Sequence, residues 1–154
     1  MTAPRQYGLS CLCLLFPPFP GGAAEPGIDH KQQYRAYITL SCREPWQAFE
    51  AAETWAGVGG GPAAHHCAAM ALPEAKQYDR AAQRLETLAA SLAADHFPTP
   101  DNVWAQAANV RFLGGWAKSA LRAIERALRD NPDAAGYLVD RGCNRVKLAI
   151  NPPH

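Results

Sequence analysis

The clearest pattern along the chain is an apolar stripe with helical spacing between Trp104 and Pro132. In its second half, apolar residues recur at i, i+1, i+4, i+7 and i+8, which places them on one helix face: Ala120, Leu121, Ile124, Ala127 and Leu128. Charged residues occupy the other face, at Lys118, Arg122, Glu125, Arg126 and Arg129. Gly114-Gly115 interrupts the pattern, and Pro132 ends it because proline has no backbone N–H to donate. The stretch therefore predicts two antiparallel helices joined by a glycine turn.

Apolar residues with the same spacing occur on both sides of this stretch. They predict helices over 31–43, from Pro45 to the glycine run 57–61, over 62–72, over 78–94 and over 133–150. Pro45 and Pro62 suit first helical turns, whereas Pro73 should end the third helix. Alanine is frequent and β-branched residues are few, which favours closely packed helices over strands. The sequence predicts an all-α fold of about six to seven helices.

Two parts of the chain resemble each other at an offset of about 39 residues, the range typical of stacked helical hairpins. Ala81 aligns with Ala120, Leu85 with Ile124 and Leu88 with Ala127. An internal repeat of this length predicts that the chain is built from stacked helix pairs.

The second unit resembles the tetratricopeptide repeat (TPR). The repeat has an aromatic residue early in helix A, small residues at its middle, a glycine turn, alanines in helix B and a closing proline; here these are Trp104, Ala107, Ala108, Gly115, Ala120, Ala127 and Pro132. The first unit departs from it, with His65 at the aromatic position and Lys76 at the turn glycine. Over residues 34–148 the order of motifs is similar to exported bacterial TPR proteins. The resemblance implies a short right-handed α-solenoid of antiparallel helix pairs.

The N-terminus has the composition of a secretory leader, with Arg5, an apolar run from Tyr7 to Phe16 and small residues after it. We interpret residues 1–24 as a signal peptide or a disordered leader, so export to the periplasm is expected if it is a signal and a cytoplasmic location if it is not. The apolar run is too short to span a bilayer. Residues 25–30 would be a linker before a TPR-like domain over 31–150. Its parts are a degenerate helix pair (31–61), two repeats (62–98 and 99–132) and a lone helix (133–150), followed by a tail (151–154).

The lone helix over 133–150 would leave an apolar face uncovered, which stacked repeats normally avoid. The chain is therefore expected either to be a truncated member of the family or to self-associate through this helix.

The 154 residues carry a formal net charge of +1. No basic run predicts nucleic-acid binding.

His65, His66 and Cys67 form the one stretch that resembles a reactive or metal-binding site. Neighbouring helical residues point about 100 degrees apart, so they cannot readily share a metal ion. The sequence contains no CxxC or HExxH spacing. We therefore predict no catalytic residue, no metal site and no cofactor. A packed Cys67 or a disulfide between Cys42 and Cys67 is favoured, since a leader would deliver the chain to an oxidising compartment.

The resemblance implies a non-catalytic scaffold that binds an unknown protein or peptide in a concave groove lined by the A helices. The candidate groove residues are His66, Met70, Asn102, Ala105, Asn109, Phe112 and Cys143. The basic clamp with which some family members hold a C-terminal carboxylate is absent, because its places hold His66, Met70, Gln106, Gly136 and Asp140. Two alternatives remain: a fragment without independent function, and a metal or thiol accessory protein that uses His65, His66 and Cys67.

Overall fold

The computed structural model describes residues 30–152, and every regular element in this range is helical. The helices are α1 (His30–Ser41), α2 (Pro45–Trp55), α3 (Gly61–Ala71), α4 (Tyr78–Ser91), α5 (Pro100–Leu113), α6 (Ala117–Asp130) and α7 (Ala135–Ile150), with a π-helical segment η1 (Ala56–Gly60) after α2. The prediction of an all-α fold is confirmed for this range. The predicted leader over 1–24, the linker up to residue 29 and the last two residues of the tail lie outside the described residues.

Proline and glycine set most of the helix ends. Pro45 and Pro100 lie in the first turns of α2 and α5, where a missing N–H leaves no helical hydrogen bond unmade. α3 ends at Ala71, before Pro73, as predicted. The glycine run does not end α2 at once, because the chain continues through η1 until Gly59, where φ is +98°. α4 ends at Ser91, earlier than the predicted 94, because Leu92 already has an extended backbone.

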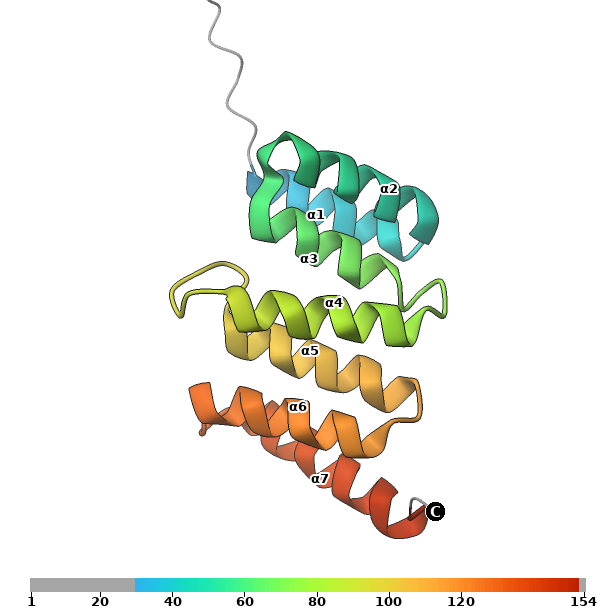
Figure 1. The fold of residues 1–154 in the computed structure, drawn as a ribbon, viewed down its shortest axis with the longest axis vertical. Helices are drawn as coiled ribbons and strands as arrows, with labels where there is room; N and C mark the ends of the chain where they lie inside the picture. The colour runs from blue at the N-terminus through green and yellow to red at the C-terminus, as the bar shows by residue number, and fades with distance from the viewer. Residues whose placement is uncertain (1–29, 153–154) are drawn as a thin grey trace, which may run out of the picture.

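Each helix packs against the next one along the chain (Figure 1). The connections alternate between the two ends of the helices, so neighbouring helices are antiparallel. Figure 1 shows α1 and α2 at one end of the molecule and α7 at the other, with α2, α4 and α6 on the side that faces the viewer. Within residues 30–152, no helix combines the length and the apolar character needed to cross a bilayer.

The turns of the α3–α4 and α5–α6 hairpins have the same hydrogen bonds. Gln77 N donates to Leu72 O (2.9 Å) and Trp116 N donates to Arg111 O (2.9 Å), the six-to-one bond of a Schellman turn. The residue before each donor has a left-handed backbone, with φ of +92° at Gly115 and +61° at Lys76. Lys76 therefore takes the same conformation as the glycine with which it aligns. The two hairpins are equivalent at an offset of 39 residues, from Lys76 to Gly115.

The core consists of small side chains around a few large ones. One cluster joins α3, α4 and α5 through fully buried Leu72, Leu85 and Val103. A second joins α1, α2 and α3, and a third joins α5 and α6 around Ile124. Alanines fill most remaining contacts, which lets the helix backbones approach closely. This close stack fixes the spacing between the exposed faces of α2, α4 and α6.

Candidate functional site

His66, one of the predicted groove residues, is buried between three helices. Its side chain is 1% exposed. The Tyr34 hydroxyl of α1 is hydrogen-bonded to His66 Nδ1 (2.8 Å), and the Gln106 Oε1 of α5 lies against His66 Nε2. The Tyr34 and His66 rings are stacked, with centroids 5.6 Å apart, and Phe97 packs edge-on against Tyr34. His66 therefore joins α1, α3 and α5 and offers no free surface to a ligand.

The ionisable groups around His66 are held in their uncharged forms. Burial lowers the pKa of His66, against the opposing effect of its hydrogen bond with Gln106. Burial raises the pKa of Cys67 to about 12, and burial together with the neighbouring Cys67 raises the pKa of Tyr34 to about 12. A thiol with such a pKa is almost wholly protonated at neutral pH, whereas nucleophiles and metal ligands need the thiolate. His65 is exposed and points away from this cluster into a different hollow.

Cys42 and Cys67, the predicted disulfide pair, are both free thiols in the structure. Cys67 is buried and its Sγ contacts the carbonyl of Tyr34 (3.8 Å), whereas exposed Cys42 contacts the carbonyl of Ile38 at the end of α1 (3.9 Å). Residues 34 and 42 are separated by about 12 Å along a helix that rises 1.5 Å per residue. The helix therefore carries Cys42 away from Cys67, and the structure does not join the predicted pair.

The other predicted groove residues do not form one surface. Asn102 and Asn109 are exposed on α5, but Ala105 between them is buried against α6. Met70 packs against the core of α3, α4 and α5. Lys147 of α7 covers Phe112, with its Nζ 4.1 Å from the ring centroid and 3.0 Å from the Phe112 carbonyl oxygen. Cys143 is exposed on α7.

A hollow of about 430 Å³ lies between α4 and α6, on the face that presents α2, α4 and α6. We call it the Trp104 hollow; its lining residues are Glu86, Ala90, Trp104, Arg111, Ser119, Arg122, Ala123, Arg126 and Arg129. The guanidinium carbon of Arg126 lies 5.7 Å from the centroid of the Trp104 ring. A second hollow of about 370 Å³ adjoins it, since both are lined by Ala90, Trp104 and Arg126. Together the hollows form one groove with an aromatic wall, and the groove is lined by four arginines and by the carboxylates of Glu86, Asp101 and Asp130.

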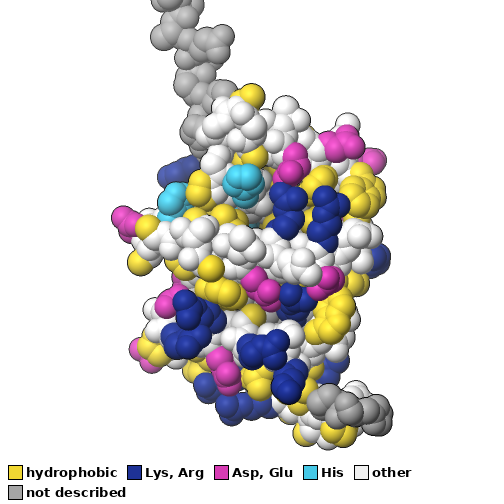
Figure 2. Space-filling view, viewed as in Figure 1, with side chains coloured by type: hydrophobic (Ala, Val, Ile, Leu, Met, Phe, Trp, Pro, Cys, Tyr) yellow, Lys and Arg dark blue, Asp and Glu magenta, His cyan; other side chains and the backbone are white. Residues whose placement is uncertain are grey.

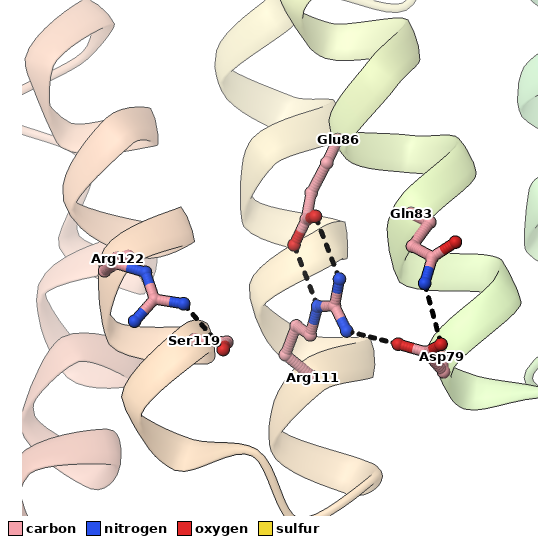
Figure 3. A network of polar contacts seen from close by, with 6 residues as sticks. All are labelled: Asp79, Gln83, Glu86, Arg111, Ser119 and Arg122. Atoms are coloured by element: carbon pink, nitrogen blue, oxygen red, sulfur yellow. Dashed lines mark hydrogen bonds and ion pairs between the residues drawn. The ribbon is translucent and has the colours of Figure 1, made fainter.

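Arg111 is the one arginine of the Trp104 hollow whose charge is neutralised by carboxylates (Figure 3). Its Nε and Nη2 donate to the two oxygens of Glu86 (both 2.9 Å), and its Nη1 donates to Asp79 Oδ1 (2.6 Å). These hydrogen bonds raise the pKa of Arg111. Arg111 therefore fastens α5 to α4 and has a structural role.

Three other arginines of the hollow have no carboxylate partner among the described residues. Arg122 donates to the Ser119 hydroxyl (2.8 Å; Figure 3), Arg126 lies over Trp104, and Arg129 is exposed. They follow one another at i, i+4 and i+7 along α6, so they lie on one face of the helix. Unpaired guanidinium groups beside an aromatic ring are well suited to bind carboxylates or phosphates.

A comparable hollow of about 480 Å³ lies on the other side of α4, and residues of α3 and α4 line it. This His65 hollow is lined by His65, Arg80, Gln83, Arg84, Thr87, Leu88 and Ser91. When 39 is added to the residue numbers of the His65 hollow, five of its seven lining residues align with residues that line the Trp104 hollow. His65, for example, aligns with Trp104. Figure 2 shows Lys and Arg side chains in both the upper and the lower part of this face, with Asp and Glu side chains among them. The two hollows are therefore equivalent sites in successive hairpins.

The sequence pattern placed the arginines of α6 on a polar face, and the resemblance placed Trp104 at the aromatic position of a repeat. It contained a signal for the site, because Arg122, Arg126 and Arg129 have helical spacing and Arg80 and Arg84 have it too. The approach of Arg126 to Trp104, and of Arg80 and Arg84 to Phe49, could not be predicted from one helix, because each aromatic residue belongs to a different helix from the arginines.

The outer face of α7 exposes apolar side chains. Val139, Val146 and Ile150 are each more than half exposed, at 64%, 58% and 70%. Together with Phe112 of α5 they line a hollow of about 600 Å³. This is the face that the sequence predicts to be uncovered.

The charged groove and the apolar face of α7 are thus the surfaces with functional potential. Among residues 30–152, no three His, Cys, Asp or Glu side chains converge as a metal site would require. Comparisons of the chain with protein-family models, with curated proteins and with solved structures found no match.

Proposed function

We propose that the protein is a non-catalytic helical scaffold that binds a protein or peptide segment in a preformed groove between α4 and α6. The observation that carries this proposal is the Trp104 hollow, in which Arg122, Arg126 and Arg129 lack carboxylate partners and Trp104 offers an aromatic wall. Aromatic and arginine side chains contribute most strongly to binding at protein interfaces. The lining residues belong to α4, α5 and α6, which pack directly on one another, so a partner would bind to a surface that the helix packing already orders.

The environment of His66 and Cys67 supports a non-catalytic role over a metal or thiol accessory function. Both groups are buried, and burial favours their uncharged forms. His66 already has a hydrogen-bonding partner at each ring nitrogen. Neither residue is available for a substrate without opening the contact between α1 and α3.

We further infer a short right-handed α-solenoid of TPR-like hairpins. The equivalent Schellman turns and the equivalent hollows at the same offset support this arrangement. Export to the periplasm rests on the leader-like residues 1–24. A piece of a longer repeat protein would present the same groove and would give the same results in the following experiment.

Photo-crosslinking from the groove tests the proposed binding function. We expect p-benzoylphenylalanine in place of exposed Ala90, which lines the groove, to form an adduct with a polypeptide in an extract of the producing cells. Placed at exposed Ala36 of α1, outside the groove, the same group should form none. Mass spectrometry of the adducts is the measurement. Equal adducts at both positions, or none at position 90, would contradict the proposal.

A second copy of the chain is the proposed partner of the α7 face. A two-fold axis would bring the apolar faces of two copies into contact, so that each covers the other. We expect Val146→Glu to convert a dimer to a monomer, because a charge would be buried in the contact. Val58→Glu, at an apolar side chain 78% exposed near the other end of the molecule, should leave the dimer intact. Light scattering over a range of concentrations measures the mass. A parent protein that stays monomeric at every concentration would refute self-association.

A further inference from the structure

The geometry points to a more specific partner, an acidic peptide segment in extended conformation that lies across α4 and places carboxylates in both the His65 hollow and the Trp104 hollow. This inference rests on the proposed binding function and names the chemistry of its ligand. We propose that the two hollows act as one track, because they are equivalent sites in successive hairpins on the same face.

The charges lining the track favour an anionic ligand. No carboxylate lines the His65 hollow, but Arg84 is paired with Glu53, so Arg80 is the arginine of this hollow that has no carboxylate partner among the described residues. The Trp104 hollow has four arginines and one carboxylate, Glu86, which Arg111 already binds. Six of the 15 Lys and Arg side chains of the chain line the two hollows, whereas only one of its 14 Asp and Glu side chains, Glu86, does so. Complementary charge would steer an acidic segment to this face.

Aromatic rings lie against some of the guanidinium groups of each hollow. Arg80 and Arg84 of α4 lie over the Phe49 ring of α2, with their guanidinium carbons 4.8 and 5.2 Å from its centroid. Arg126 lies over Trp104 in the same manner, at 5.7 Å. A guanidinium held on a ring loses less side-chain freedom when it binds a carboxylate. The track is therefore preorganised for separate carboxylates.

Carboxylates beside the track favour a peptide over a nucleic acid. Glu53 is paired with Arg84, and Asp101 and Asp130 line the hollow that adjoins the Trp104 hollow. A nucleic-acid strand carries a charge on every phosphate and would meet these carboxylates along its course. A peptide can place neutral residues at those points and acidic residues opposite the arginines.

The spacing of the hollows sets the spacing of the acidic residues. Equivalent sites in successive hairpins are two helices apart, which is at most roughly 20 Å at ordinary packing distances between helix axes. An extended peptide advances about 3.3 Å per residue, so no more than about six residues separate the two sites. The preferred ligand therefore has two acidic clusters up to about six residues apart.

Fluorescence anisotropy with synthetic peptides tests this ligand. The probe is a fluorescein-labelled peptide with two Glu-Glu pairs six residues apart in a Gly/Ser chain, and the reference peptide has Gln in place of every Glu. We expect the acidic peptide to bind more tightly than the Gln peptide by at least about tenfold and to weaken as salt rises. A thymidine oligonucleotide of equal charge, labelled in the same way, should bind more weakly than the acidic peptide.

Variants locate the binding. Arg122→Gln with Arg129→Gln should weaken the acidic peptide by about tenfold, since two charge-assisted contacts are lost. Arg80→Gln should weaken the same peptide severalfold through the other hollow. Among residues 30–152, Arg122 donates one side-chain hydrogen bond, to Ser119, and neither Arg122 nor Arg129 has an ion pair, so their replacement should leave the melting temperature unchanged. The matched control is Arg35→Gln with Arg43→Gln, which removes the same charge from exposed positions outside both hollows and should not weaken binding.

Equal affinity for the acidic and Gln peptides would overturn the inference, as would an equal loss in the Arg35/Arg43 control or tighter binding of the oligonucleotide. In those cases a polypeptide adduct from position 90 would still uphold the binding function of the groove. If position 90 forms no adduct and neither peptide binds, the binding function itself fails.

Discussion

Leu85→Ala is expected to lower the free energy of unfolding by about 3 kcal/mol and the melting temperature by roughly 10 °C. Leu85 is fully buried in the cluster that joins α3, α4 and α5. Its replacement removes apolar contacts and leaves a cavity between the helices, because the methyl groups of the surrounding alanines are too short to fill it. Denaturant unfolding followed by circular dichroism measures the loss.

Thr87→Ala is the control for this prediction. Thr87 lies on the same helix, but its side chain is exposed, so the change should alter the free energy of unfolding by less than about 0.5 kcal/mol. A comparable loss in both variants, or a loss below about 1 kcal/mol for Leu85→Ala, would show that the α3–α5 cluster does not hold the stack together.

The protein is expected to lose stability as the pH falls below about 6.5, the ordinary pKa of histidine. Burial depresses the pKa of His66 in the folded state, so the unfolded chain takes up the proton first. Between the unfolded and folded pKa values, the free energy of unfolding therefore decreases by up to about 1.4 kcal/mol for each unit of pH. Above the pKa that His66 has in the unfolded chain, its contribution to the free energy of unfolding no longer changes with pH. Urea unfolding at half-unit steps from pH 7.5 to about 5.5 would measure the slope.

Two neighbouring histidines provide the control. His66→Gln should remove most of the slope, since it deletes the buried titrating group. His65→Gln should retain the slope, because the adjacent His65 side chain is exposed. The same slope in the parent and in His66→Gln would contradict the assignment to His66.

The helices could be predicted because their signals are local. The apolar stripe at Ala120, Ile124 and Ala127 has the period of a helix, and proline and glycine mark its ends. The turn at Lys76 was harder to predict, because a lysine with positive φ gives no such signal. Only the alignment of Lys76 with Gly115 indicated that the two turns are equivalent, as their hydrogen bonds show.

The candidate site could not be predicted in the same way. His66 lies on an A-type helix, where the resemblance implied a groove, but Tyr34 and Gln106 come from other helices and cover it. The arginines of α6 were recognised as a polar face, yet their approach to Trp104 depends on how α6 packs on α5. The expected groove residues were therefore partly misplaced.

By itself, the sequence determined the helical class, the order of the helices and the repeat of about 39 residues, because each depends on spacing along the chain. Tertiary structure alone decided that His66 is enclosed, that Cys42 and Cys67 stay apart and that Trp104 and the arginines share a hollow. The physical reason is that burial and charge pairing depend on side chains far apart in the sequence, brought together by the packing of one helix on another.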